Sequence, residues 1–184
     1  TYNLKGTIST LEDGKYIKLP KLKKVKIKCH RQIGQGELIK SCTISKTPTG
    51  KYYISILVEY TRETEYKEVV SEFQVVGLDF SMKDLYYSSE DKKANYPRYY
   101  RESLEKLAIE QRKLSRKKIG SKNRDKQRLK VAKLHEHIAN QRKDFLHKKS
   151  RELVSEFDAI CIEDLNMKAM SQCLNFGKSV HDNG

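Results

Sequence analysis

The chain has 184 residues, and its 38 Lys and Arg against 24 Asp and Glu give a formal net charge of +14. That length is enough for one ordinary domain or two small ones, each with a buried core. The sequence has no run approaching the roughly 18 consecutive apolar residues of a membrane span, and no signal-peptide pattern at its start. We therefore expect a cytosolic protein without a membrane partner.

Most of the positive charge lies in one stretch, because Lys and Arg outnumber Asp and Glu by 19 to 6 in residues 98–151. So concentrated a charge attracts polyanions, with an affinity that falls as salt rises. Nucleic acid is the natural partner; the alternative is a solvated helix face that keeps the chain soluble. The cysteines are far apart and form no CxxC pair, so neither a zinc knuckle nor a disulfide framework is indicated. They are Cys29, Cys42, Cys161 and Cys173.

Residues 1–74 alternate apolar and polar side chains in short runs such as "KYIKLP", "KKVKIKCH" and "KYYISILVEY", separated by the turn signals "EDG", "GQG" and "PTG". Period-two patterning with this punctuation predicts antiparallel strands. Five such strands suit a compact barrel of the oligonucleotide-binding (OB) type. We therefore predict a β-rich, nucleic-acid-binding domain over residues 1–74.

Residues 75–97 contain "VVGLDF", a run that is apolar on both faces. This composition predicts a central strand that is covered on both sides. Asp79 then lies where an unpaired carboxylate costs several kcal/mol unless a cationic group meets it. A metal ion is one such partner.

Residues 99–156 read as two helices joined by a turn at "IGSKN". Leu104, Leu107 and Leu114 recur at helical spacing, Gly120 interrupts the pattern, and Ser121 is placed to cap the second helix. A longer apolar stripe from Val131 onward predicts packing against a partner helix. His135, His137 and His147 are predicted to be surface or helix-contact residues, because residues two apart on a helix point away from each other.

After this antiparallel hairpin, "AICI" predicts a second short strand that ends at Glu163. A strand, a helical crossover and another strand form a βαβ-type connection, so the two strands are expected to be parallel. Asp79 and Glu163 then meet at one edge and jointly hold Mg²⁺ or Mn²⁺. Taken singly, each acid has an alternative role as a helix N-cap or a solvated turn residue.

The segments "GLDFSMKD", "QRKLSRKKIGSKNRDKQRLKVAKLHEHIANQRKDFLHKKS" and "ICIEDLNMKAM" resemble the TnpB (OrfB-type) proteins of bacterial insertion sequences over roughly residues 50–184. The resemblance implies an α+β protein: a β-barrel (wedge, OB-like) segment, then a partial RNase H-like (RuvC) α/β domain over 75–184 with a long basic helical hairpin. It also implies a guide RNA and target DNA as partners, in the cytoplasm of a bacterium or archaeon near the nucleoid. Asp79 and Glu163 match the acids of the first two RuvC motifs.

The same resemblance implies an RNA-guided DNA endonuclease that works by two-metal phosphodiester hydrolysis. Family members continue into a four-cysteine zinc module and a third catalytic aspartate, so Zn²⁺ is expected only there. We expect the present chain to be a fragment with little or no cutting activity. The alternatives are a guide-RNA-bound repressor whose nuclease has decayed, hence a non-catalytic nucleic-acid-binding module, and a DNA transposase of the same fold.

The turn of the hairpin supplies the candidate nucleic-acid contacts, because a guide RNA–DNA duplex requires a positive channel that reads backbone shape. The candidates are Arg112, Lys113, Arg116, Lys117, Lys118, Lys122 and Arg124.

Overall fold

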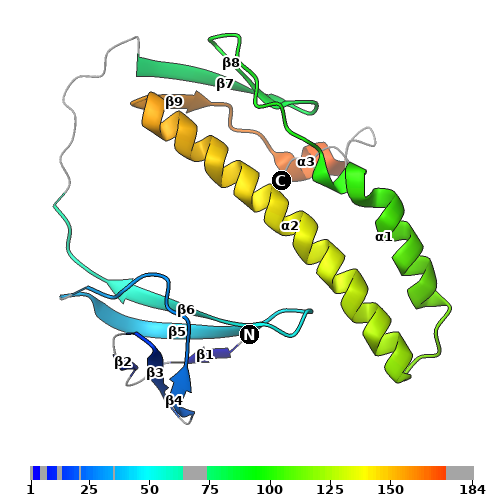
Figure 1. Cartoon of the computed structure of the whole chain (residues 1–184). Helices are drawn as coiled ribbons and strands as arrows, with labels where there is room; N and C mark the ends of the chain where they lie inside the picture. Colours follow the sequence, from blue (N-terminus) through cyan, green and yellow to red (C-terminus); the bar gives the residue numbers. More distant parts are fainter. Residues whose placement is uncertain are drawn as a thin grey trace. The chain divides into compact units, whose positions relative to one another are not determined.

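The computed structural model describes residues 2–4, 8–11, 14–20, 22–34, 36–63 and 74–172. The chain divides into two compact units, Thr1–Tyr66 and Lys67–Gly184, whose elements are labelled in Figure 1. The expected domain boundary at residues 74/75 adjoins the stretch 64–73, which lies outside the described residues. Cys173 lies outside them as well.

The first unit contains two antiparallel three-stranded sheets. One has the order β1-β5-β6, with β1 Tyr2–Leu4, β5 Leu38–Lys46 and β6 Tyr52–Glu59; the other has the order β2-β3-β4, with β2 Ser9–Leu11, β3 Tyr16–Leu19 and β4 Lys23–Lys26. The turn between β5 and β6 is the "TPTG" segment, where Gly50 has φ +86°. A side chain would be strained there, which explains the glycine.

The core of this unit is made by alternate residues of the strands, as the period-two pattern predicts. Ile17, Leu19 and Cys42 are buried together, and isoleucines of β5 and β6 pack against them. Burial raises the pKa of the Cys42 thiol. The described strands of this unit form two separate sheets and no closed barrel, so the prediction of a compact five-stranded barrel was wrong. Closure requires pairing between strands distant in sequence, which alternation does not encode.

The second unit begins with a mixed sheet of order β8-β7-β9, in which β7 (Val75–Ser81) is central, β8 is Leu85–Ser88 and β9 is Ala159–Ile162. β8 is antiparallel to β7, whereas β9 is parallel to it, from Val75 opposite Ala159 to Leu78 opposite Ile162. The backbone N–H of Asp158 donates to Gln74 O at 2.9 Å and extends this pairing by one step. The predicted parallel pair is therefore confirmed.

The two strands are connected through a helical hairpin, α1 (Tyr99–Ser115) and α2 (Lys122–Glu156), whose helices lie side by side in Figure 1. The Ser121 side chain accepts a hydrogen bond from Arg124 N at 3.2 Å, so the predicted N-cap is confirmed. Leu107 of α1 and Val131 and Ile138 of α2 are the buried hydrophobic residues of the two helices. A short helix, α3 (Met167–Gln172), follows β9.

Three aromatic rings join the segment before α1 to the middle of α2. Tyr96 packs edge-on against Phe145 with centroids 5.2 Å apart, and against Tyr99 at 5.7 Å. Such edge-to-face pairs favour one mutual orientation of the packed segments. They hold the loop that leaves the sheet against the hairpin.

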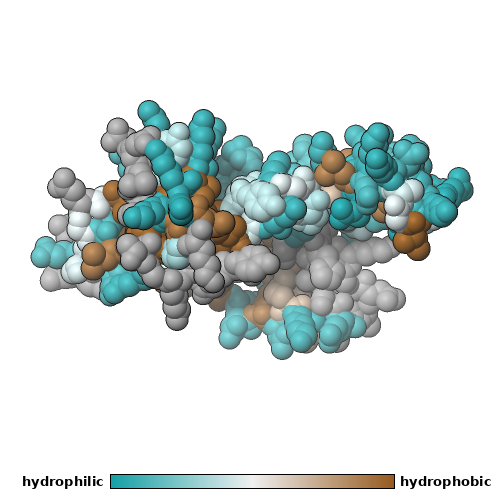
Figure 2. Space-filling model, turned by 90° about the horizontal axis from the view of Figure 1, so that it is seen from below, coloured by the Kyte–Doolittle hydropathy of each residue, from teal (hydrophilic) through white to brown (hydrophobic). Residues whose placement is uncertain are grey.

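No helix in the described part of the chain is long and apolar enough to cross a membrane. Hydrophilic side chains cover much of the face seen in Figure 2, and hydrophobic ones gather in smaller areas between them.

Candidate metal centre and nucleic-acid interface

Asp79 lies within β7, two residues before its last residue Ser81, and Glu163 directly follows the last residue of β9. The register pairs Leu78 with Ile162, so the next residue of each chain segment brings Asp79 beside Glu163. Because side chains alternate along a strand, Gly77 and Asp79 share a face of the sheet with Cys161 and Glu163. The two acids thus follow paired residues of neighbouring strands. That they hold one cation together stays a prediction.

This face of the sheet carries a shallow open depression of about 510 Å³. Its lining includes both acids together with a glycine, a tyrosine and two serines. The lining residues are Gly77, Leu78, Asp79, Tyr87, Ser88, Ser89, Cys161, Ile162 and Glu163.

Asp79 is exposed, so the expectation of a buried carboxylate on a strand covered on both sides was wrong. Val76 is fully buried on the opposite face. There, burial raises the pKa of Tyr86, which also senses the charges of Lys149 and Glu152 on α2. The hairpin therefore covers one face of the sheet, and the described residues of the second unit place no second layer over the face that carries Asp79.

Neither the Asp79 carboxylate nor the Glu163 carboxylate has a hydrogen-bond or ion-pair partner in the part of the chain that the structure describes. Two neighbouring carboxylates with free oxygens are hard ligands of the kind that suits Mg²⁺ or Mn²⁺. The described residues contain no group of three or more His, Cys, Asp or Glu able to hold a metal ion. Two protein ligands are thus the most that this part of the chain offers.

Asp84 and Tyr87 form a second polar pair beside the depression, which the sequence did not reveal. Asp84 is buried and accepts a hydrogen bond from Tyr87 OH at 2.7 Å, which raises the pKa of the tyrosine. Tyr87 lies directly across the strand pair from Asp79. The burial of Asp84 depends on the three-dimensional fold, which no local pattern in "SMKD" indicates.

The seven candidate cations of the hairpin divide into two groups. Lys113 Nζ binds Glu110 Oε1 at 2.6 Å, and Arg112 Nε donates to Ala108 O at 3.4 Å. Arg124 Nη1 donates to the carbonyls of Leu114 and Lys117 at 3.1 Å each. These three side chains therefore bind other groups of the hairpin. The side chains of the other four have no partner among the described residues: Arg116, Lys117, Lys118 and Lys122.

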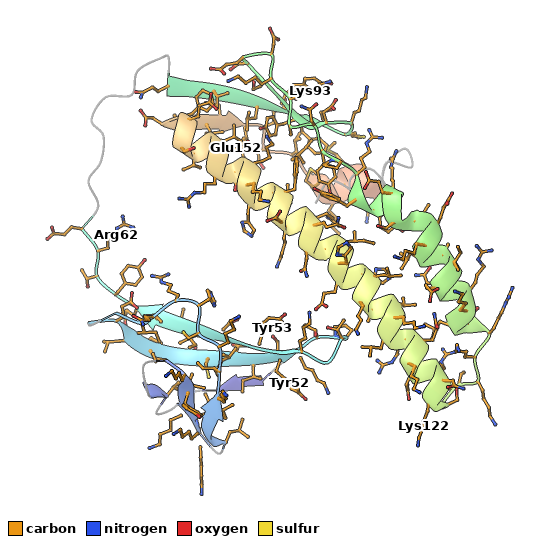
Figure 3. All side chains as sticks on the ribbon, in the orientation of Figure 1. Tyr52, Tyr53, Arg62, Lys93, Lys122 and Glu152 are labelled. Atoms are coloured by element: carbon orange, nitrogen blue, oxygen red, sulfur yellow. The ribbon has the colours of Figure 1, made fainter. Side chains whose placement is uncertain are left out.

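Figure 3 shows Lys122 at the turn end of the hairpin, at the start of α2. The four unpartnered cations all belong to this end, within seven residues of sequence, and three of them are well exposed. Their ammonium and guanidinium groups are free to contact phosphates. The structure thus favours these four over the three structural cations as the contact set.

Gln127 is a structural residue that the sequence analysis missed. It is only 5% exposed, and its Nε2 donates to Glu110 Oε2 at 2.6 Å and to Glu110 O at 3.1 Å. The hydrogen bond from Lys113 and then the bond from Gln127 lower the pKa of Glu110. This network locks α1 to α2 near the turn.

The histidines of α2 are exposed, as expected. Cys29, Cys42 and Cys161 are free thiols, in line with the absence of CxxC spacing.

Comparison with known proteins identifies the family. Residues 55–174 match OrfB_IS605, described as "Probable transposase". The chain is 33% identical over 156 residues to a "Putative RNA-guided DNA endonuclease" of Streptomyces pristinaespiralis, covering 85% of this chain and 38% of that protein. It is 35% identical over 161 residues to the "Putative RNA-guided DNA endonuclease InsQ" of Escherichia coli K12, covering 88% of this chain and 39% of the relative.

The chain therefore belongs to the OrfB_IS605 family, and the resemblance to TnpB-type proteins is confirmed. It spans less than two fifths of the length of these two curated relatives. The matched region contains the β7–β9 pair and the whole helical hairpin.

Proposed function

We propose that this chain carries the first part of a RuvC-like nuclease centre in an RNA-guided DNA endonuclease. The observation that carries the proposal is that Asp79 and Glu163, on the neighbouring β7 and β9 segments, both line one open depression. Their carboxylates have no partner among the described residues. The names of the relatives support DNA cutting as the activity of the whole protein.

Asp79 and Glu163 would hold Mg²⁺ or Mn²⁺. When bound, such ions lower the pKa of water and stabilise the leaving oxygen in phosphodiester hydrolysis. The two residues contribute carboxylate oxygens from adjacent strands of one rigid sheet, and the exposed face leaves room for a nucleic-acid backbone. Because the described residues offer two protein ligands, we expect this chain to hold an ion weakly and to cut DNA poorly by itself.

The basic turn of the hairpin would hold the backbone of a guide RNA–target DNA duplex. Arg116, Lys117, Lys118 and Lys122 supply the charge, and contacts of this kind position a duplex without reading its sequence. The strand-rich first unit would add a further nucleic-acid surface.

A DNA-joining transposase is the second candidate, because the description of the family itself names that activity. Joining and cutting use the same carboxylates and the same cation chemistry. A nucleic-acid-binding module whose nuclease centre has decayed is less well supported. Such decay usually removes the catalytic carboxylates first, and both Asp79 and Glu163 are present.

The activity test uses the 184-residue chain with labelled single-stranded DNA in Mn²⁺, alongside Asp79→Ala and Glu163→Ala. Cutting should be weak or absent, and whatever cutting occurs should disappear in both variants. Cleavage that survives either substitution would show that the assigned acids are not the catalytic ones. Strand transfer to a second DNA molecule in the same reactions would favour the transposase.

A further inference from the structure

The turn between α1 and α2 presents one apolar side chain in a strongly basic setting. Residues 112–124 contain seven Lys or Arg and no Asp or Glu. Ile119 lies in the middle of this stretch and is 82% exposed, more than any other large hydrophobic side chain in the described part of the chain. The two residues that precede it, Lys117 and Lys118, are both lysines.

The backbone of the turn is fixed by hydrogen bonds, so Ile119 is held outward. Ser121 N and Ser121 Oγ both reach Lys118 O, at 3.2 and 2.8 Å. Arg124 Nη1 ties the carbonyls of Leu114 and Lys117 to the first turn of α2. Gly120 follows with φ +79°, and apart from Gly120 and its two chain neighbours no residue lies within 4 Å of the position its Cβ would take. The exposed isoleucine is therefore part of an ordered apex.

A single exposed isoleucine is ordinary on a protein surface. What distinguishes this one is its position between cations whose side chains have no partner among the described residues. A polyanion that also carries apolar faces satisfies both features at once, and nucleic acid is such a ligand, since its stacked bases lie directly inside its phosphate backbone. Apolar wedges such as Ile, Leu and Met enter duplexes from the minor groove and unstack a base step.

The minor groove of an A-form duplex is wide and shallow, so a short side chain on a turn reaches its base edges. An anionic membrane would also attract the charge. However, one isoleucine buries only enough apolar surface for about 2 kcal/mol, far less than the apolar face of an interfacial helix.

We propose that Ile119 is a wedge that contacts base pairs through the minor groove of an RNA–DNA duplex, while Arg116, Lys118 and Lys122 hold the phosphates on either side. The wedge loosens one base step and fixes the hairpin at that place on the duplex. This inference rests on the proposed nucleic-acid-binding function and adds a base-contacting residue to it.

The first experiment follows isoleucine δ1-methyl NMR signals of the full 184-residue chain as a 20-base-pair RNA–DNA duplex is added. Ile119→Val identifies the Ile119 signal. We expect that signal to move upfield, because the ring currents of the bases shield a methyl group packed against them. Ile109, half-exposed on α1 away from the turn, is the matched internal control and should move little.

The second experiment places 2-aminopurine at successive positions of the DNA strand, one per duplex, and measures its fluorescence at saturating protein. Unstacking brightens this base analogue. The unmodified chain should brighten it at one or more positions, and Ile119→Ser should lose most of that increase. The affinity of Ile119→Ser should fall by no more than about tenfold and keep its salt slope, since phosphate contacts dominate both.

The outcomes separate the wedge from the function on which it rests. The chain could bind the duplex in a salt-dependent way while the Ile119 methyl signal does not move, and this result overturns the wedge alone. The same conclusion follows if the chain binds and Ile119→Ser gives the same 2-aminopurine fluorescence as the unmodified chain. Failure of the chain to bind the duplex overturns the binding function and the wedge with it. A methyl shift on phosphatidylglycerol vesicles but not on the duplex assigns Ile119 to a membrane surface and also overturns the wedge.

Discussion

Asp79 is exposed to water, so burial is not the reason for a cation beside it. The case for a metal ion rests instead on adjacency: Glu163 follows the residue paired with Leu78, and both acids line the same depression. Two like charges held close together repel each other, and a divalent cation between them removes that cost.

Gln127 is the side chain whose removal we expect to harm the hairpin most directly. Gln127→Ala leaves Glu110 without its donor inside the helix pair and should lower the free energy of unfolding by about 1–3 kcal/mol. Urea denaturation followed by circular dichroism measures this. The matched control is Gln111→Ala on α1, an exposed site where the change should stay within about 0.5 kcal/mol. Equal effects of the two variants would contradict the interhelical role of Gln127.

Glu110 should make the hairpin sensitive to acid. Its pKa in the folded chain is lowered by Lys113 and Gln127 from an ordinary value of 4.5. The unfolded chain therefore binds the proton more readily, so the stabilisation is complete above pH 4.5 and is lost as the pH falls through the lowered value. Melting temperatures measured across this range should fall with acid in the unmodified chain and change less steeply in Glu110→Gln. Identical profiles would exclude Glu110 as a source of the acid sensitivity.

Some cationic side chains of the helical hairpin bind groups of its own turn, and others face solvent. Arg124→Ala removes the hydrogen bonds to the carbonyls of Leu114 and Lys117 and should cost about 1.5–3 kcal/mol of stability. Lys118→Ala should leave stability within about 0.5 kcal/mol but weaken duplex binding and reduce its salt slope by about 1. Denaturation and binding titrations on both variants test this. A stable Arg124→Ala variant would contradict the division.

Elements with a strong local pattern could be predicted from the sequence. The parallel pair follows from two apolar runs joined by a long crossover, and the cap at Ser121 follows from its place after Gly120. The burial of Gln127 and Asp84 could not be predicted, because each depends on a partner that only the packed hairpin or turn supplies. The predictions of a barrel and of a covered face around Asp79 were wrong for a similar reason. Both depend on how layers pack, which alternation within one strand does not specify.

At the scale of the molecule, the positive charge belongs mainly to the hairpin, and the part near its turn should dominate binding. Replacing Arg116, Lys117, Lys118 and Lys122 with Gln should reduce the salt slope of duplex binding by about 3. The matched control neutralises four cations farther from the turn, Lys106, Lys133, Lys143 and Arg151, and should reduce the slope by less than half as much. Equal reductions would mean that total charge, rather than the turn, governs binding.

The pairing of Asp79 with Glu163 is tested most directly by Mn²⁺ titration of the chain, followed by electron paramagnetic resonance, with Asp79→Asn, Glu163→Gln and the double variant. Each single change should weaken Mn²⁺ binding by about tenfold or more. The double change should add little, because both residues serve one ion. Asp164→Asn, the neighbouring exposed acid, should bind like the unmodified chain. Unchanged affinity in either single variant, or independent losses that add in the double variant, would show that the two acids do not share an ion.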